Sequence, residues 1–304
     1  GWNGDREFPE PATLFDDYAG RGKAEHEQDM TLAKTFTPVD AKLQAPKSLS
    51  AEQRVAWDAY YGPRNEKFLA ANLSGPDLVR WRYQRYMHDY LACVKAIDEA
   101  VGRMLDALDA EGIADETVVI LSSDQGFFLG EHGWFDKRWI FEESLRAPLI
   151  VRWPGLTEPG SSCARIVSLV DFAPTVLALA RVPVPEGMQG RALQPLLAGH
   201  SPDDWRTSLY YHYYEYPVPH RVRPHRGVVT DRYKLVHYYG PDVDDWELLD
   251  READPLETRS FHADPAYAER LRDLRAELDR LRDELGDTSP PPRTAFGDKP
   301  FDAR

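Results

Sequence analysis

The chain has 304 residues, 42% of them apolar and 29% charged, which is typical of globular domains and excludes disordered, collagen-like and coiled-coil chains. At this length we expect one large α/β domain with a smaller appendage. The formal net charge of −14 disfavours binding to nucleic acid, although positive side chains gathered in one cleft could still hold a small anion.

The first third of the chain is predicted to end in a long helix. Residues 1–75 are rich in Pro, Asp and Lys and are expected to form surface connections with short helical pieces at 11–20 and 52–59. A helix is predicted over residues 78–110 because apolar residues recur there at helical spacing: Leu91, Val94, Ile97, Val101, Leu105 and Leu108. Gly112 is expected to end this helix.

Buried strands are predicted after this helix. The β-branched run at residues 117–121 predicts a strand buried on both faces, and residues 147–153 predict a second one. Residues 167–170 are a candidate third strand, and Asp171 is expected to cap a helix over residues 172–180. A helix followed by a buried strand is typical of the α/β class.

The chain changes in character after residue 200. Four aromatic, alternating segments predict a small antiparallel sheet: residues 208–214, 226–230, 233–239 and 246–250. A closing helix is predicted over residues 267–285, where leucines share one helical face. The Pro-rich tail, residues 287–304, is expected to be loosely ordered.

The cysteines and the apolar runs narrow the class of protein further. Cys93 and Cys163 lack CxxC or Cys/His spacing, so we expect neither a disulfide framework nor a zinc site and interpret both as small apolar fillers. No apolar run approaches the roughly 20 residues of a membrane span, so no membrane partner is expected. The sequence as given has no signal-peptide pattern, and the oligomeric state is left open.

The loop at residues 122–139, SSDQGFFLGEHGWFDKRW, carries the candidate chemistry. It begins where a buried strand ends, which is the usual ligand position in an open α/β sheet. The neighbouring oxygens of Asp124 and Gln125 could bind a hard cation such as Ca²⁺ or Mg²⁺, although two ligands do not complete its shell. Lys137 follows thirteen positions after Asp124, and the glycine-rich turn could bring it back to form a pocket for a sulfuryl or phosphoryl group. An isolated Asp-Gln pair after a strand is more often a turn or a helix cap, and it is the long motif around it that favours a metal site.

Long stretches of the sequence resemble the C-terminal part of a type I, formylglycine-dependent sulfatase of the alkaline-phosphatase-like superfamily. They cover nearly all of residues 8–285 and include DYLACVKAIDEAVGRMLDALD, TVVILSSDQGFFLGEHGWFDKRW, EESLRAPLIVRWPG, LVDFAPTVLALA and RGVVTDRYKLVHYY through WELLDREADPLE. The resemblance implies an α/β fold in which residues 1–200 form the C-terminal part of the catalytic domain. Residues 201–286 would then be a small α+β subdomain with an antiparallel sheet.

The resemblance also implies roles for individual residues. The SD-x-G motif of the family would place the metal, Ca²⁺ or Mg²⁺, on Asp124 and Gln125. Many family members have Asn or His at the second position, and Gln keeps an oxygen ligand there. The lysine that follows the GEHG turn of the family binds the sulfate, which implies a catalytic role for Lys137.

Four further residues are candidate substrate contacts. His132 lies in the turn and either contacts the sulfate or stabilises the turn. Asp136 and Arg138 either bind adjacent sugar hydroxyls or form a surface salt bridge. His225 belongs to a basic segment, with His220, Arg221, Arg223 and Arg226, that lines the mouth of the active site in similar sulfatases. It is either a substrate contact or an ordinary loop residue.

The nucleophile of the family is not found in this sequence. Sulfatases convert the Cys or Ser of a C-x-P-S-R or S-x-P-S-R motif to formylglycine, and neither Cys93 nor Cys163 has that context. The paired Asp ligands and the upstream Lys and His of the family normally precede the segment that begins here at Phe8. Truncation and a split or degenerate protein are the two explanations, and the retained metal and sulfate ligands favour truncation.

Three functions follow from these features. The first is hydrolysis of a sulfate ester. The substrate would be a sulfated carbohydrate, for which N-acetylglucosamine 6-sulfate is the candidate, or an aryl sulfate. The second is a phosphodiesterase or phosphonate hydrolase of the same superfamily, and the third is a non-catalytic carbohydrate-binding remnant. We predict that this chain alone has no sulfatase activity. Without the first half of a parallel sheet, the strands at 117–121 and 147–153 would expose apolar faces and favour aggregation or oligomerisation. A periplasmic or secreted location would suit the parent protein.

Overall fold

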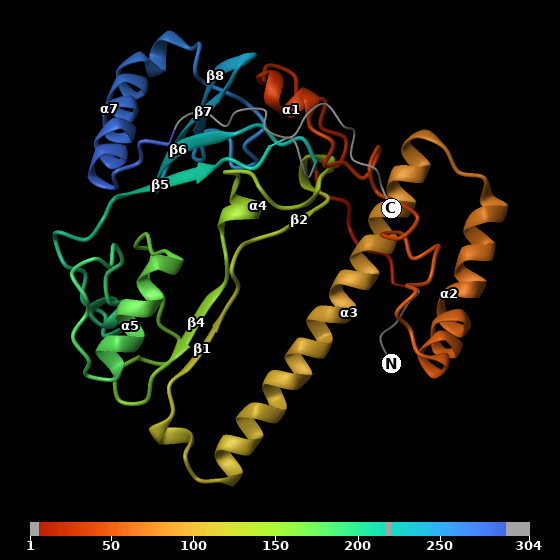
Figure 1. Ribbon diagram of the computed structural model, residues 1–304, viewed down its shortest axis with the longest axis horizontal. Helices are drawn as coiled ribbons and strands as arrows, with labels where there is room; N and C mark the ends of the chain where they lie inside the picture. Colours follow the sequence, from red (N-terminus) through yellow and green to blue (C-terminus); the bar gives the residue numbers. More distant parts are fainter. Residues whose placement is uncertain (1–5, 217–219, 290–304) are drawn as a thin grey trace.

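The computed structural model describes residues 6–216 and 220–289. Figure 1 shows a helical arm at one side, a two-stranded ribbon with short helices in the middle, and a four-stranded sheet at the other end. The α-helices are α1 Lys23–Glu27, α2 Ala51–Ala71, α3 Gly75–Ala110, α4 Glu142–Leu145, α5 Phe172–Leu179, α6 Gln194–Leu197 and α7 Ala268–Glu284. The strands are β1 Val119–Ser122, β2 Phe128–Leu129, β3 Phe135–Asp136, β4 Leu149–Arg152, β5 Ser208–Tyr213, β6 His225–Thr230, β7 Tyr233–Gly240 and β8 Val243–Asp250. In these described residues, no helix has the length and apolar character that crossing a membrane requires.

The first 75 residues contain more structure than predicted. The predicted helical piece at 52–59 belongs to the much longer α2, which begins with a capping box between Ser50 and Gln53. Gly62 and Pro63, which usually indicate a helix break, lie inside it. The piece at 11–20 forms turns and no helix. The expectation of mere surface connections was also wrong, because large apolar side chains of this segment are buried in the core, among them Phe8, Leu14, Met30, Leu32 and Phe36.

Helix α3 has the predicted end but not the predicted burial. Gly112, with a φ of +68°, follows its last residues as expected. Only its first half packs against the body of the protein, through Tyr83, Arg85 and Met87. No residue from His88 onwards in the helix is buried, and the expected apolar fillers Cys93 and Cys163 are both exposed.

Strands β1 and β4 form an antiparallel pair in which Val119 lies opposite Arg152. We predicted strands of a parallel sheet buried on both faces, and both the direction and the burial were wrong. The apolar exposure that we expected in a chain without the first half of that sheet is confirmed. The side chains of Ile120 and Leu121 are each 39% exposed and that of Ile150 is 63% exposed. Helix α5 packs near this ribbon, but little else in the described chain covers it.

The segment before α5 also differs from its prediction. Residues 167–170 do not form a strand, and a 3₁₀-helix at Leu169–Asp171 occupies this position. Asp171 does not cap α5 with its side chain, because the buried carboxylate accepts hydrogen bonds from the backbone N–H groups of Ser168 and Arg191, each at 2.8 Å. It also forms an ion pair with the guanidinium of Arg206. A carboxylate with these partners is not available to the helix end.

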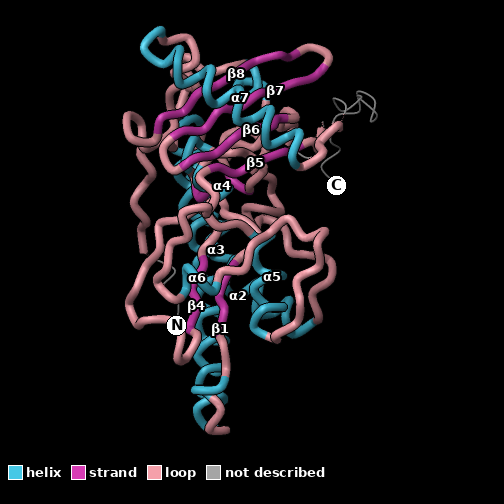
Figure 2. The backbone as a smooth tube through the Cα atoms, turned by 90° about the vertical axis from the view of Figure 1, so that its left-hand side faces the viewer, coloured by secondary structure: helices cyan, strands magenta, loops and turns pink. Residues whose placement is uncertain are grey.

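The C-terminal sheet was predicted correctly in all four strands. Its order is β5-β6-β7-β8, and every neighbouring pair is antiparallel. Helix α7 lies across one face of it (Figure 2). Six side chains of this interface are buried: Val228, Leu235, Leu248, Leu274, Leu278 and Leu281. The Pro-rich tail from residue 290 onwards lies outside the described residues.

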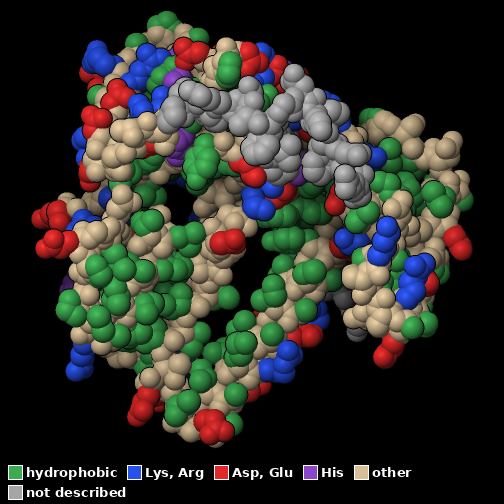
Figure 3. Space-filling model, viewed as in Figure 1, with side chains coloured by type: hydrophobic (Ala, Val, Ile, Leu, Met, Phe, Trp, Pro, Cys, Tyr) green, Lys and Arg blue, Asp and Glu red, His purple; other side chains and the backbone are tan. Residues whose placement is uncertain are grey.

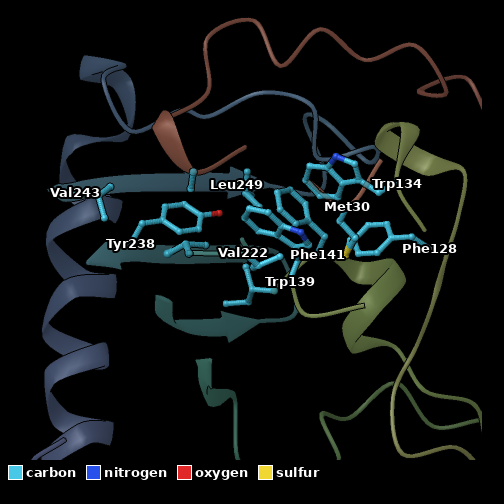
Figure 4. Close-up of a cluster of buried hydrophobic side chains, with 12 residues drawn as sticks. Met30, Phe128, Trp134, Trp139, Phe141, Val222, Tyr238, Val243 and Leu249 are labelled. Atoms are coloured by element: carbon cyan, nitrogen blue, oxygen red, sulfur yellow. The ribbon is translucent and has the colours of Figure 1, made fainter. Parts of the chain in front are cut away.

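A second core joins the motif loop to the other face of the sheet. Figure 4 shows Trp134 and Trp139 of the loop, and Phe141 just after it, beside Tyr238 and Leu249 of the sheet. Trp134 and Trp139 stack with their ring centroids 4.8 Å apart. Because all five side chains are buried, the loop is held firmly against the C-terminal sheet.

Candidate active site

The candidate site is built on a short hairpin within residues 122–139. Strands β2 and β3 pair with Phe128 opposite Asp136, so that the chain turns back and Lys137 follows directly after the residue opposite the start of β2. Gly130 occupies the turn with a φ of +100°, and a Cβ atom there would lie 2.7 Å from the Tyr83 ring. Gly126 approaches the Glu143 carbonyl so closely that a Cβ atom would lie 2.0 Å from its oxygen. Only glycine fits either position without displacing these neighbours.

Asp124 and Gln125 follow β1 after one intervening residue, Ser123. Asp124 is exposed, and its carboxylate accepts a hydrogen bond from the Ser123 hydroxyl at 3.3 Å. The two side chains supply the oxygen donors that Ca²⁺ and Mg²⁺ prefer. In the described residues, however, no group of three or more His, Cys, Asp or Glu side chains could hold a metal ion. These two residues fit a hard cation in chemistry and supply only part of its shell.

Three positively charged or titratable side chains contact the carboxylate of Asp136. Lys137 Nζ lies 3.0 Å from Oδ1, His220 Nε2 lies 3.3 Å from Oδ2, and the Arg138 guanidinium also pairs with Oδ2. Burial alone would raise the pKa of the Asp136 carboxyl, but the hydrogen bonds from His220, Arg138 and Lys137 hold it well below its ordinary value. Asp136 and Arg138 are only 16% and 14% exposed, so their ion pair is mostly buried.

The backbone on both sides of Lys137 is strained. Asp136 has a φ of +73° and Arg138 a φ of +99°, values that are unfavourable for residues with a Cβ atom. Two contacts hold this conformation: the Arg138 N–H donates to Ser144 Oγ at 3.1 Å, and the Tyr211 hydroxyl donates to the Arg138 carbonyl at 3.3 Å. Strain of this kind is common where a side chain must be held in a functional orientation.

His132 is fully buried in the turn of the hairpin. Its Nδ1 lies 2.9 Å from Asp16, whose carboxylate also pairs with Arg21 at 2.7 Å, and its backbone N–H donates to Thr13 at 2.9 Å. Burial lowers the pKa of His132, although the hydrogen bond with Asp16 acts in the opposite direction. These contacts support the interpretation that His132 stabilises the turn.

His225 is the first residue of β6, and its side chain is also fully buried. Its Nδ1–H donates to the Arg223 carbonyl at 2.7 Å, and its ring stacks against Trp139 and Tyr211 with centroids 5.6 and 5.4 Å away. Burial lowers the pKa of His225 to about 4, so the ring is neutral at pH 7. In the described chain it lies behind the loop that carries Arg138 and does not reach the surface.

Three residues in contact with this loop were not predicted as site residues. His220 belongs to the basic segment that the sequence did indicate, but nothing in the sequence paired it with Asp136. Ser144 and Tyr211 lie 6 and 73 positions from Arg138 in the chain. Hydroxyl groups at such separations carry no local signal, and only the folded structure identifies them.

Known proteins match both halves of the chain. The Sulfatase family model matches residues 8–182, and the model for the C-terminal region of N-sulphoglucosamine sulphohydrolase matches residues 130–284. An N-acetylglucosamine-6-O-sulfatase from Bacteroides thetaiotaomicron is 44% identical over 301 residues, which cover 93% of this chain and 54% of that protein.

Solved structures match the fold as well. One, described as a complex with its substrate D-glucosamine-2-N,6-O-disulfate, is 43% identical with a TM-score of 0.90 and is matched over 94% of this chain and 62% of that chain. A phosphonate monoester hydrolase from Agrobacterium radiobacter is 25% identical with a TM-score of 0.61, over 68% of this chain and 43% of that chain. The chain spans about half the length of the curated relatives it matches. On these matches and on the α/β fold, the chain belongs to the sulfatase family.

Proposed function

We propose that this chain forms the metal-binding and anion-binding part of a sulfuric ester hydrolase. The observation that carries the proposal is the hairpin, which returns Lys137 toward the Asp124-Gln125 end of the loop. An ammonium group near a bound cation would create a pocket for the oxygens of a sulfuryl group. Membership of the sulfatase family supports this reaction class.

The family implies a metal ion and a formylglycine nucleophile. Asp124 and Gln125 would contribute two oxygen ligands to the metal, which would polarise the ester when bound. Lys137 would neutralise a sulfate oxygen through its ammonium group. No C-x-P-S-R or S-x-P-S-R motif occurs in this sequence, so the nucleophile would come from another polypeptide segment.

The proposed substrate is a sulfated carbohydrate, with N-acetylglucosamine 6-sulfate as the first candidate. The names of the Bacteroides relative and of the substrate-bound solved structure support a sulfated glucosamine. Asp136 offers acceptors and Arg138 a forked donor, a combination that suits neighbouring sugar hydroxyls. His225 would contribute by packing behind the Arg138 loop, and His132 by holding the turn.

Binding of N-acetylglucosamine 6-sulfate in the presence of Ca²⁺, followed by calorimetry, tests the proposal. Lys137→Ala should weaken binding at least tenfold, which corresponds to about 1.4 kcal/mol. The matched control is Lys95→Ala, which removes an exposed lysine paired with Glu99 on α3 and should change nothing. Equal binding by both variants, or equal binding of unsulfated N-acetylglucosamine, would contradict the proposal.

We also expect the chain by itself to show no turnover, because it lacks the nucleophile motif. Incubation with an aryl sulfate and Ca²⁺, compared with Ca²⁺ alone, measures this directly. Hydrolysis above the metal-only blank would show that the chain contains a nucleophile that we have not identified.

A phosphoryl ester or phosphonate is the alternative substrate class. The likeness to a phosphonate monoester hydrolase supports it, and a pocket made by Lys137 and a metal does not itself distinguish sulfuryl from phosphoryl oxygens. Competition between phenyl phosphonate and the sulfated sugar for the same chain decides between them. A purely carbohydrate-binding chain would bind the sugar equally well without Ca²⁺ and after Asp124→Asn.

A further inference from the structure

One serine outside the motif loop contacts both ends of that loop. Ser144 lies in the short helix α4, and its side chain is buried. The Gly126 N–H donates to the Ser144 carbonyl at 2.7 Å, and the Arg138 N–H donates to Ser144 Oγ at 3.1 Å. Gly126 lies near the start of the loop and Arg138 near its end. A single residue therefore joins the two ends.

The two amides that Ser144 holds are next to the proposed functional side chains. The Gly126 N–H belongs to the peptide group that links Gln125 to Gly126, directly after the two candidate metal ligands. The Arg138 N–H belongs to the peptide group that links Lys137 to Arg138, directly after the candidate sulfate ligand. Because each peptide group is planar, holding its N–H also orients the carbonyl end of the residue before it. We call residues 124–126 the metal end and residues 137–138 the anion end of the loop.

Ser144 is itself held in place by the core. Its N–H donates to the Phe141 carbonyl at 3.1 Å. Phe141 is fully buried among the aromatic side chains between the loop and the C-terminal sheet (Figure 4). The N–H, the carbonyl and the hydroxyl oxygen of Ser144 are thus each used in one hydrogen bond. A residue packed and bonded in this way gives both loop ends a fixed reference point.

The backbone of α4 touches the metal end directly. A Cβ atom at Gly126 would lie 2.0 Å from the Glu143 carbonyl oxygen and 3.0 Å from the carbonyl carbon of Ser144. At the anion end, the hydroxyl of the same serine holds the strained backbone of Arg138. A shift of Ser144 would therefore move or release both ends.

Other elements hold other parts of the loop. Strands β2 and β3 pair Phe128 with Asp136, inside the two ends. Helix α3 contacts the middle of the loop, where the Tyr86 hydroxyl donates to the Phe128 carbonyl at 2.9 Å. Figure 3 shows a gap between α3 and the part of the molecule with β1 and β4. Tyr211 contacts the anion end alone, through the Arg138 carbonyl.

We propose that Ser144 is a positioning residue that sets the distance between the metal end and the anion end, so that a bound cation and the Lys137 ammonium contact the same sulfuryl group. This inference rests on the proposed function. A cation and an ammonium group stabilise one anion together only when both reach its oxygens. Ser144 acts through Gly126 and Arg138 and needs no contact with the substrate. Its removal should therefore weaken the coupling between cation binding and sulfate binding.

Calorimetry measures this coupling as the factor by which saturating Ca²⁺ strengthens binding of N-acetylglucosamine 6-sulfate to the chain. For the unmodified chain we expect a factor of about ten or more. Ser144→Ala removes Oγ but leaves the carbonyl that holds Gly126. The Kd for Ca²⁺ alone should then stay within about twofold, while the factor should fall to about three or less.

Two further variants separate positioning from stability. Ser208→Ala is the matched control, because it removes the same atom from another buried serine, whose hydroxyl donates to Glu277 on α7. It should leave the factor unchanged. Gly126→Ala breaks the contact at the other end, since its Cβ atom would collide with the Glu143 carbonyl oxygen. This variant should weaken binding of Ca²⁺ and lower the factor as well.

Hydrogen exchange without ligands tests the contact itself. In Ser144→Ala the Arg138 amide, measured by NMR, should exchange about tenfold faster or more, because it loses its acceptor. The amides of β6 and β7 should keep their rates, since they belong to the C-terminal sheet. Faster exchange confined to the anion end supports the proposal, and an unchanged Arg138 amide overturns it.

The binding results separate this inference from the proposed function. A factor that persists in Ser144→Ala or in Gly126→Ala overturns the role of Ser144 alone. An equal fall in Ser208→Ala overturns it too, because the effect would then come from general destabilisation. If Ca²⁺ does not strengthen sugar binding by the unmodified chain, the proposed function fails and this inference fails with it.

Discussion

The C-terminal sheet and the β1–β4 ribbon both consist of short apolar antiparallel strands, but only the first is covered. Leu235 and Leu248 are fully buried between their sheet and α7, whereas Ile120 and Ile150 are 39% and 63% exposed. A strand sequence thus indicates which side chains can be buried, and the packing partner decides whether they are. Substitutions in the covered sheet should therefore change the stability more than substitutions in the β1–β4 ribbon.

The largest effect is expected at Lys234, on the face of the C-terminal sheet opposite α7. Its side chain is fully buried and pairs with Glu142 at 2.9 Å and Glu257 at 2.7 Å. Lys234→Met would leave Glu257 buried without this cation and should lower the free energy of unfolding by about 3–5 kcal/mol. Urea unfolding at pH 7 measures the change.

The control for this prediction is Lys23→Met. Lys23 pairs with Glu27 and Asp242 at the surface, and removing such an exposed pair should lower the stability far less than Lys234→Met does. Burial raises the pKa of Glu257 even with Lys234 present, so the penalty in Lys234→Met should decrease at pH 5, where the carboxyl can take up a proton. Equal losses in the two variants would mean that the buried network contributes little.

Leu248→Ala tests the covered face itself. Leu248 is fully buried in the cluster that β6, β7 and β8 form with α7, and its truncation should cost about 2–5 kcal/mol. Leu256→Ala removes the same atoms from a side chain that is 50% exposed and should cost much less. Thermal unfolding followed by circular dichroism compares them. Similar stability losses in Leu248→Ala and Leu256→Ala would show that α7 does not cover this face of the sheet.

Glu143 should make the stability of this protein depend on pH. It lies in α4, and burial, reinforced by the Glu257 and Glu131 carboxylates, raises its pKa to about 7. Because this value lies above that of an unfolded glutamate, its contribution to stability is present at low pH and is lost as the pH rises through about 7. The loss should amount to about 2–3 kcal/mol.

Stability measured from pH 5 to pH 8 tests this effect. Glu143→Gln should flatten the dependence, and Glu52→Gln, at an exposed position on α2, should leave it unchanged. An unchanged slope in Glu143→Gln would assign the pH dependence to other groups.

The sequence predicts those parts of the fold that depend on local pattern. The alternation in residues 208–250 identified all four strands of the C-terminal sheet, because each strand carries one side that packs under a partner present in the same chain. The strand predicted at residues 167–170 does not form, because Asp171 is held by an ion pair with Arg206, 35 positions away in the chain. Apolar content wrongly predicted that β1 and β4 are buried on both faces, because it does not specify which segment covers a strand. The exposure that we expected without the rest of the sheet is confirmed.

For the candidate site too, the sequence predicts only the residues that belong to one local motif. The motif placed Asp124, Gln125 and Lys137 on one loop, and their proposed roles stay predictions. The residues that hold the strained Arg138 backbone, Ser144 and Tyr211, come from outside this motif. The sequence also could not indicate that His132 and His225 are buried, since their neighbours come from distant segments.

The smallest effect is expected on the exposed side of the β1–β4 ribbon. Ile150→Ala removes more atoms than many core substitutions, yet in this chain alone it should change the free energy of unfolding by less than about 0.5 kcal/mol, because the side chain is already 63% exposed. Urea unfolding of Ile150→Ala, compared with that of the unmodified chain, measures this change. A cost above 1 kcal/mol in the chain alone would mean that β4 is already packed, and the contrast between the two sheets would then be wrong.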